Sequence, residues 1–202
     1  AMRFDNQAQF HPLKFLKALA EKIPGGGSHV FEQTEAVDIE EGDPAGVLTR
    51  NGNRIKAQRV IIASHFPYFD GGGLYFSRIY LEKSYIVAVK LSEAFAQGMF
   101  ISTEDPPRSL RSQSYDGGEI ILVAGENHKT GYEVNTTIHY QNLLNFAKDN
   151  FAVQEVLYRW STQDCMTIDG VPFIGHLTRR TPHLLVATGF GKWGISNGTA
   201  AA

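Results

Sequence analysis

The chain of 202 residues has very little cysteine and no long apolar run, and both absences narrow what it can be. Its one cysteine, Cys165, excludes an intramolecular disulfide, and a cytoplasmic location is therefore expected. The longest wholly apolar run, Ile120–Ala124, has five residues. A membrane-spanning helix needs about 20, so no membrane partner is expected. The N-terminus also lacks an apolar stretch of signal-peptide length.

The chain also has no large excess of positive or negative residues. Lys and Arg number 19 against 21 Asp and Glu, which gives a net charge of −2, and no basic run occurs. A nucleic-acid partner is therefore not expected. The seven histidines show no close pairing of the kind that binds metal, so no metal site is predicted.

Both ends of the sequence predict a piece excised from a longer protein. Ala1 stands before Met2 and has the form of a cloning remnant. The other end, Gly198–Ala202, stops in a helix-forming run that has no capping residue.

The first 70 residues read as an α/β segment. Leu13, Leu16, Ala20 and Ile23 form one apolar stripe after Pro12, which predicts a helix. Residues 29–41 read as extended. The Asn51-Gly52 dipeptide predicts a hairpin between strands at 46–50 and 54–57. The apolar run 59–64 predicts a short strand covered on both faces, as in a parallel sheet.

The next 90 residues favour an antiparallel sheet. Apolar residues alternate over 85–91, and Asp116-Gly117-Gly118 predicts a hairpin between 108–115 and 119–124. One helix is expected at 140–151, capped by Thr136 or Thr137, followed by a strand at 155–160.

The α/β pattern returns near residue 163. A short apolar strand at 184–187 runs into Gly189, Gly191 and Gly194, and then into a helix. We expect this strand to share a sheet with 60–63. By spacing alone, the Gly-x-Gly-x-x-Gly turn is either a nucleotide-binding loop or a tight turn with packing glycines.

The segment Asp169–Gly175, followed by Leu184–Gly194, resembles the C-terminal signature of D-amino-acid-oxidase-like flavoproteins, which include glycine and sarcosine oxidases. Three further segments match in order: Gln33–Ile39 resembles the strand at the adenine end of FAD, Val60–His65 resembles an apolar strand before the cofactor, and Arg108–Glu126 resembles the substrate-domain hairpin. The run Trp160–Cys165 is similar to a subgroup with a downstream Rieske iron–sulfur domain.

The resemblance implies an α+β fold, in which an antiparallel substrate-binding sheet with a packed helix is inserted in part of an α/β FAD-binding domain. The expected boundaries are 9–70 (partial FAD-binding subdomain), 71–162 (substrate-binding domain) and 163–202 (C-terminal part of the FAD-binding subdomain). The parent protein would be an enzyme that oxidises an amine or amino acid by hydride transfer to FAD. A downstream iron–sulfur domain of the same parent chain is a further expected partner.

The resemblance also assigns site residues, although none is singled out as catalytic. The residues expected to bind the cofactor are Val37, Ala63, Ser64, Gly189, Phe190, Gly191, Lys192, Trp193 and Gly194. Lys192 is alternatively a solvated lysine and Trp193 a packing residue. The residues expected to bind substrate are Arg111, Tyr115 and Arg78, with Arg108 as a further candidate, because guanidinium groups pair bidentately with carboxylates. Three tyrosines could line the pocket but are more readily explained as packing residues: Tyr75, Tyr80 and Tyr85.

The sequence departs from the family pattern in two places. The strand, glycine turn and helix that hold the FAD pyrophosphate are absent, so this chain alone is expected to be inactive and without tightly bound FAD. His65 stands where many members have a small residue. Cys165 is expected to be a buried structural thiol. The competing hypothesis is a non-catalytic, β-rich module that binds a small ligand.

Overall fold

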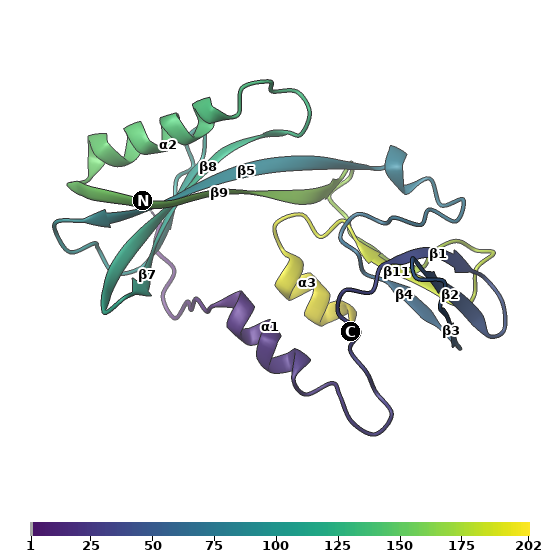
Figure 1. Cartoon of the computed structure of the whole chain (residues 1–202). Helices are drawn as coiled ribbons and strands as arrows, with labels where there is room; N and C mark the ends of the chain where they lie inside the picture. Colours follow the sequence, from purple (N-terminus) through teal and green to yellow (C-terminus); the bar gives the residue numbers. More distant parts are fainter. Residues whose placement is uncertain (1) are drawn as a thin grey trace.

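The computed structural model describes residues 2–202. The elements in chain order are α1 (Pro12–Ala20), β1 (Ala36–Glu40), β2 (Ala45–Thr49), β3 (Arg54–Ala57), β4 (Val60–Ile62), a 3₁₀ turn (Tyr75–Ser77), β5 (Ile79–Leu91), β6 (Met99–Ile101), β7 (Arg108–Tyr115), β8 (Gly118–Lys129), α2 (Thr137–Asn150), β9 (Val153–Thr167), β10 (Phe173–His176), β11 (Leu184–Thr188) and α3 (Gly194–Ala201). Mixed α+β architecture is as expected (Figure 1). None of the helices in residues 2–202 is long and apolar enough to cross a membrane.

The largest sheet is antiparallel, with strand order β6-β7-β8-β5-β9, and α2 covers one of its faces (Figure 1). Alternation places Tyr85, Val87 and Val89 of β5 on the α2 side, where they pack with Leu143 and Ala147. The predicted antiparallel insert with its hairpin and helix is therefore confirmed. Burial of Tyr85, which is 1% exposed, also makes it a core residue and not a pocket wall.

Two local predictions in this sheet need correction. The hydroxyl of Thr136 makes no capping bond; the Asn135 Oδ1 accepts the backbone N–H of Thr137 at 3.1 Å instead. The sequence predicts the last strand at 155–160, but β9 runs over 15 residues, because it pairs along the whole length of β5. Pairing with a long neighbour extends a strand beyond the segment that its own alternation marks.

The second lobe contains the sheet β10-β11-β4. β4 and β11 are parallel neighbours, with Leu184 opposite Val60 and Val186 opposite Ile62. The prediction that these two distant strands share a sheet is confirmed. The prediction that residues 59–64 are covered on both faces is wrong within this chain: Ile62 is 3% exposed, but Ile61 is 66% exposed.

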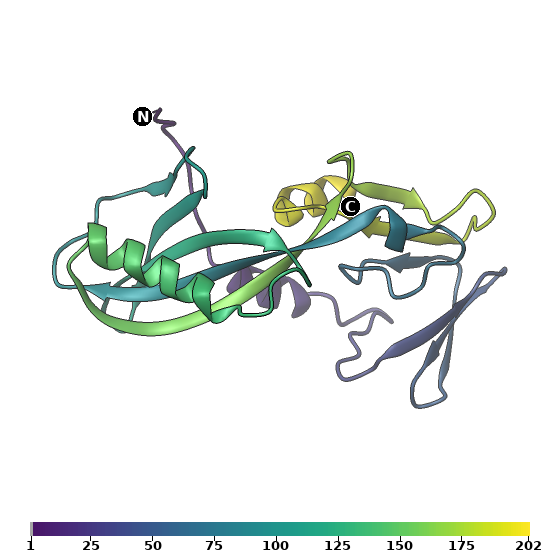
Figure 2. The ribbon, with the colours of Figure 1, turned by 90° about the horizontal axis from the view of Figure 1, so that it is seen from above.

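A hairpin sheet, β1-β2-β3, completes this lobe and confirms the Asn51-Gly52 turn. Ile39 and Ala45 of this sheet share one core with Ile62 and Leu184, and that core also includes Ile79 and Cys165, which lie near the ends of β5 and β9. Figure 2 shows these two long strands joining the lobes. β9 crosses position 162, and β5 begins nine residues after position 70, so the expected domain boundaries remain predictions.

Helix α1 confirms the predicted helix but not a buried role for its stripe. No residue of α1 is buried, and Leu13, Leu16 and Ile23 are each about half exposed. The helix lies on the side of the large sheet away from α2 (Figures 1 and 2).

Candidate functional site

The turn between β11 and α3 requires glycine at two positions. Gly189 and Gly191 have φ of +73° and +55°, in the left-handed region that other residues rarely occupy. A Cβ on Gly189 would lie 2.4 Å from Cγ2 of Thr167. The N–H of Gly191 donates to the carbonyl of Cys165 at 3.0 Å. The turn is therefore tied closely to the end of β9.

The N-terminus of α3 is open. Its N-cap residue is Trp193, whose side chain makes no capping hydrogen bond, and its first turn holds no acidic residue. The first N–H groups of a helix have no partner inside the helix, so these donors and the positive end of the helix dipole are available to an anionic group. A Cβ on Gly194 would meet nothing within 4 Å.

A groove of about 1220 Å³ runs past this turn. It is lined by Ala63 and by the whole predicted segment Gly189–Gly194, together with His65 and Asp164. Phe10 and Leu16 of the N-terminal segment form part of its wall. The strand pairing of β4 and β11 thus brings two predicted cofactor segments, more than 120 residues apart in sequence, to one surface.

Two of the predicted cofactor residues lie outside this groove. Ser64 donates through Oγ to the carbonyl of Phe66 at 3.0 Å, and it does not line the groove. Val37 lies on β1, in the hairpin sheet, with 40% of its surface exposed.

Lys192 is neither freely solvated nor free to pair with a ligand. Its Nζ lies 2.8 Å from Oδ2 of Asp164 and 3.1 Å from Oε1 of Glu82, and it donates to Oγ of Ser84 at 3.0 Å. Burial alone would lower the pKa of Lys192, but the hydrogen bonds to the two carboxylates outweigh it and raise the pKa. Lys192 therefore stays protonated and anchors the glycine turn to β5 and β9.

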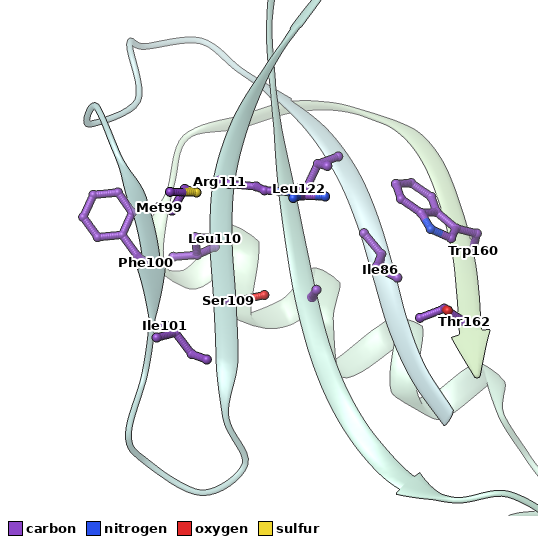
Figure 3. Close-up of a pocket in the computed structure, with 11 residues that line it drawn as sticks. Ile86, Met99, Phe100, Ile101, Ser109, Leu110, Arg111, Leu122, Trp160 and Thr162 are labelled. Atoms are coloured by element: carbon purple, nitrogen blue, oxygen red, sulfur yellow. The ribbon is translucent and has the colours of Figure 1, made fainter. Parts of the chain in front are cut away.

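A second hollow, of about 510 Å³, lies on the large sheet (Figure 3). Ile86, Leu122, Trp160 and Arg111 project into it from four neighbouring strands, on the face opposite α2. The lining is otherwise mainly apolar, with edge strand β6 contributing Met99, Phe100 and Ile101. Arg111 is the one charged residue in this lining, and its guanidinium has no hydrogen-bond or ion-pair partner within residues 2–202.

The two hollows follow one another along a single sheet face. Trp160 and Thr162 of β9 line the sheet pocket, and Asp164 lines the groove. Residues two apart in a strand point to the same side, so these three side chains form one row. The cross-strand partners on β5 are Ile86, Ser84 and Glu82, in the same order.

The structure separates the predicted arginines. Arg111 lines the sheet pocket, but Arg78 stands just before β5, in the other lobe. Its guanidinium donates to the carbonyl of Gly73 at 2.6 Å and lies 4.6 Å from the ring centre of Phe173. Arg111 pairs with Leu122 of β8, which in turn pairs with Ala88 of β5. Ala88 is ten residues from Arg78, which is about 33 Å along the strand. The two cannot clamp one small carboxylate together.

Three further candidates have structural partners. Arg108 forms a buried ion pair with Glu126 on the α2 side, so the hypothesis that it clamps substrate is wrong. The hydroxyl of Tyr115 is hydrogen-bonded to that of Tyr158, at the far end of the sheet from the groove. Tyr75 is 3% exposed and donates to the carbonyl of Leu177, so it is a core residue.

Sequence reasoning does not identify several residues of this surface. Glu82, Asp164, Trp160 and strand β6 all reach it, although none is among the predicted site residues. Glu82, Ser84 and Ile86 alternate on β5, and Trp160, Thr162 and Asp164 alternate on β9. That alternation is visible in the sequence, but only the pairing of the two strands shows that their rows coincide.

The sequence matches the model of the family described as FAD dependent oxidoreductase over residues 1–202. The chain belongs to this family.

One relative and two solved structures illustrate the likeness. A protein of Bacillus subtilis strain 168, YhfW, which carries the name of a Rieske 2Fe-2S iron–sulfur protein, is 42% identical over 202 residues, which are all of this chain and 40% of that protein. Glycine oxidase from Geobacillus kaustophilus superposes with a TM-score of 0.69 at 21% identity, covering 87% of this chain and 47% of that one. L-proline dehydrogenase from P. horikoshii gives 0.67 at 21%, covering 86% and 48%. The chain thus spans less than half the length of these proteins.

Among residues 2–202, no group of three or more His, Cys, Asp or Glu side chains could hold a metal ion. The part of the chain that the structure describes therefore provides no set of ligands for the iron–sulfur cluster that the name of the Bacillus subtilis relative mentions.

Proposed function

We propose that this chain is the substrate-binding part, with a portion of the FAD-binding part, of a longer enzyme that oxidises an amine or amino acid by hydride transfer to FAD. One observation carries the proposal: the open N-terminus of α3 and the sheet pocket share one continuous face, with Asp164 between them. A cofactor at the first and a substrate in the second would lie next to each other.

The groove fits the isoalloxazine end of FAD. The uncapped N–H donors of α3 and the positive end of its dipole suit the negative charge that reduced flavin carries near N1 and the C2 carbonyl. Ala63 and Gly189–Gly194 would line this position, with Phe190 and Trp193 as apolar neighbours. Val37 and Ser64 would lie toward other parts of the cofactor.

The chemistry that FAD supplies is a two-electron oxidation. When bound, FAD would accept the hydride equivalent from a C–H bond next to the amine, the amine would lose one proton to solvent, and a carbon–nitrogen double bond would form. The residues of the chain bind and orient: Arg111 offers the pocket an unpaired cation, Lys192 holds the glycine turn against the sheet, and Tyr115 supports the rim through Tyr158. Arg78 lies in the other lobe, so it would not contact a substrate group held by Arg111.

We also propose that a downstream iron–sulfur domain belongs to the same parent chain and that the parent is cytoplasmic. The first rests on the name of the Bacillus subtilis relative and on the share of that protein that lies outside this match. The second rests on the single cysteine, whose thiol is buried and unpaired.

The cofactor site is tested by a matched pair of substitutions in α3. Gly194→Ala places a methyl group in open space at the helix N-terminus, whereas Gly198→Ala places one 3.9 Å from the ring of Phe190, outside the groove lining. Both should favour the helix, by about 0.5–1 kcal/mol each. In the full-length protein we expect lower flavin content for Gly194→Ala alone, measured by the flavin absorbance bands. Equal flavin content in the two variants would refute the assignment.

The second test is an FAD titration of the 202-residue chain. We expect no tight binding, because the described residues provide one glycine turn that feeds a helix and none for the pyrophosphate. Each missing charge-assisted hydrogen bond is worth roughly 1.5–3 kcal/mol, so several lower the affinity by orders of magnitude. Stoichiometric FAD on the purified chain would contradict this. If the full-length protein also bound no flavin, the competing ligand-binding module would be favoured.

A further inference from the structure

The point where the sheet pocket meets the cofactor groove carries an excess of negative charge. Glu82 and Asp164 are cross-strand partners there, and their side chains are 22% and 20% exposed. Lys192 is the one cation within ion-pair distance of either carboxylate in residues 2–202, so two negative charges face one positive charge. The formal charge of these three side chains is −1.

The nearest additional lysine does not change this balance at close range. Lys129 of β8 is the cross-strand neighbour of Glu82, but it forms no ion pair with it. Its Nζ lies 5.3 Å from the ring centre of Tyr80 and 5.4 Å from that of Tyr132, in the direction away from the sheet pocket. Lys192, in turn, already forms ion pairs with both carboxylates, so its single positive charge does not offset a third carboxylate.

An α-amino acid is poorly matched to this place. Its carboxylate is bonded to the same carbon that carries the amine, so a reacting carbon beside the cofactor groove brings the carboxylate there too. The substrate carboxylate would then lie near Glu82 and Asp164, with no unpaired cation beside it to offset its charge. Like charges in a partly desolvated site repel. A cationic amine meets the opposite situation, because the excess charge attracts it.

The one free cation of the pocket is remote. Arg111 lies in the row of Ala88, six residues along β5 from Glu82, which is about 20 Å along the strand. The apolar side chains of Ile86, Leu122 and Trp160 lie between them (Figure 3), and the hydroxyl residues Ser84 and Thr162 separate these from the two carboxylates. An acid group held by Arg111 would therefore belong to the far end of a substrate and not to its reacting carbon.

We infer that the site selects an amine with an apolar substituent and without a carboxylate on the reacting carbon, in preference to α-amino acids. This inference rests on the proposed function for its chemistry, but not for its binding preference. The amine lies toward Glu82 and Asp164, the apolar substituent lies over Ile86 and Trp160, and any acid group of the substrate lies at Arg111.

Binding to the 202-residue chain tests the preference without flavin. Trp193→Phe leaves Trp160 as the single tryptophan, and its quenching reports occupancy of the sheet pocket. The compounds are matched pairs that differ by one α-carboxylate: isoamylamine with leucine, and 2-phenylethylamine with phenylalanine. We expect each amine to bind at least about tenfold more tightly than its amino acid, a difference of about 1.4 kcal/mol. Equal or reversed affinities, or no quenching by either amine, would overturn the inference.

Charge variants separate this role from a structural one. Asp164→Asn removes one negative charge and should narrow the amine preference by about tenfold, whereas Lys192→Gln removes the positive charge and should widen it by a similar factor. A purely structural ion pair would weaken both ligands in both variants and leave the ratio unchanged. Thermal unfolding of each variant establishes that it is folded.

Full-length protein distinguishes the failure of each proposal. If it binds FAD and oxidises leucine or phenylalanine with a higher kcat/KM than the matched amine, the proposed function stands and the inference on substrate class is wrong. If it binds no FAD while the chain still discriminates the pairs, the proposed function fails and the binding preference stands.

Discussion

Removing the carboxylate of Glu126 should destabilise the large sheet more than removing any exposed charge of that sheet. Glu126 of β8 is 8% exposed and contacts side chains of β7 and α2. It pairs with the guanidinium of Arg108, whose side chain is 12% exposed, and accepts from Nδ1 of His139 at 3.1 Å and Nδ2 of Asn142 at 2.8 Å. One carboxylate thus satisfies three side chains on two other elements.

The size of the effect follows from what remains after the change. Glu126→Ala leaves the buried Arg108 guanidinium without a counter-charge, and breaking a buried pair in this way costs about 3–5 kcal/mol. Glu126→Gln keeps an acceptor and should cost less, about 1.5–3 kcal/mol, the value of a hydrogen bond to a charged group. The double variant Arg108→Met with Glu126→Leu should recover the part of the loss that comes from the unpaired charge, whereas His139 and Asn142 still lack their acceptor.

Urea unfolding followed by far-UV circular dichroism measures these differences. Glu119→Ala on the same strand is the control, because Glu119 is exposed, and its effect should stay within about 0.5 kcal/mol. A loss below about 1 kcal/mol for Glu126→Ala would show that the guanidinium finds water or another partner, and no recovery in the double variant would show that the lost acceptor of His139 and Asn142, and not the unpaired charge, sets the cost. The reasoning about this ion pair would then be wrong.

Three further outcomes are expected. Burial would raise the pKa of Glu126, but hydrogen bonds from Asn142 and His139 and the charge of Arg108 outweigh it and lower the pKa. The stabilisation is therefore complete above the unfolded-state pKa of about 4.3 and is lost as the pH falls through the lower pKa of the folded state; the stability gap between wild type and Glu126→Gln should accordingly narrow as the pH falls below about 4.3 in urea titrations. Burial, and then the charge of Asp164, raise the pKa of the Cys165 thiol to about 11, so a thiol reagent at pH 8 should label the native chain far more slowly than the unfolded one, and equal rates would contradict this. Leu143 of α2 is fully buried against the large sheet, and Leu143→Ala should cost about 2–5 kcal/mol in the same unfolding assay, whereas a loss under 1 kcal/mol would mean that the helix does not pack as described.

The local elements and the family can be predicted from the amino-acid sequence. Alternation over 85–91, the Asn51-Gly52 and Asp116-Gly117-Gly118 turns and the Gly189–Gly194 loop each depend on neighbours in the chain, and all four have the predicted form. Backbone conformation at a turn and the facing of successive residues are short-range properties, so they can be read before any tertiary contact is known.

Which charged side chains lack a partner depends instead on tertiary contacts. Arg78, Arg108 and Arg111 are equivalent as sequence, yet one lies over Phe173, one is buried against Glu126, and one opens on the sheet pocket. Likewise, the pairing of β5 with β9 puts Glu82 beside Asp164, and the turn after β11 brings Lys192 to both. These contacts join residues that are far apart in the chain, and a charge's availability depends on such partners, which periodicity and spacing do not specify.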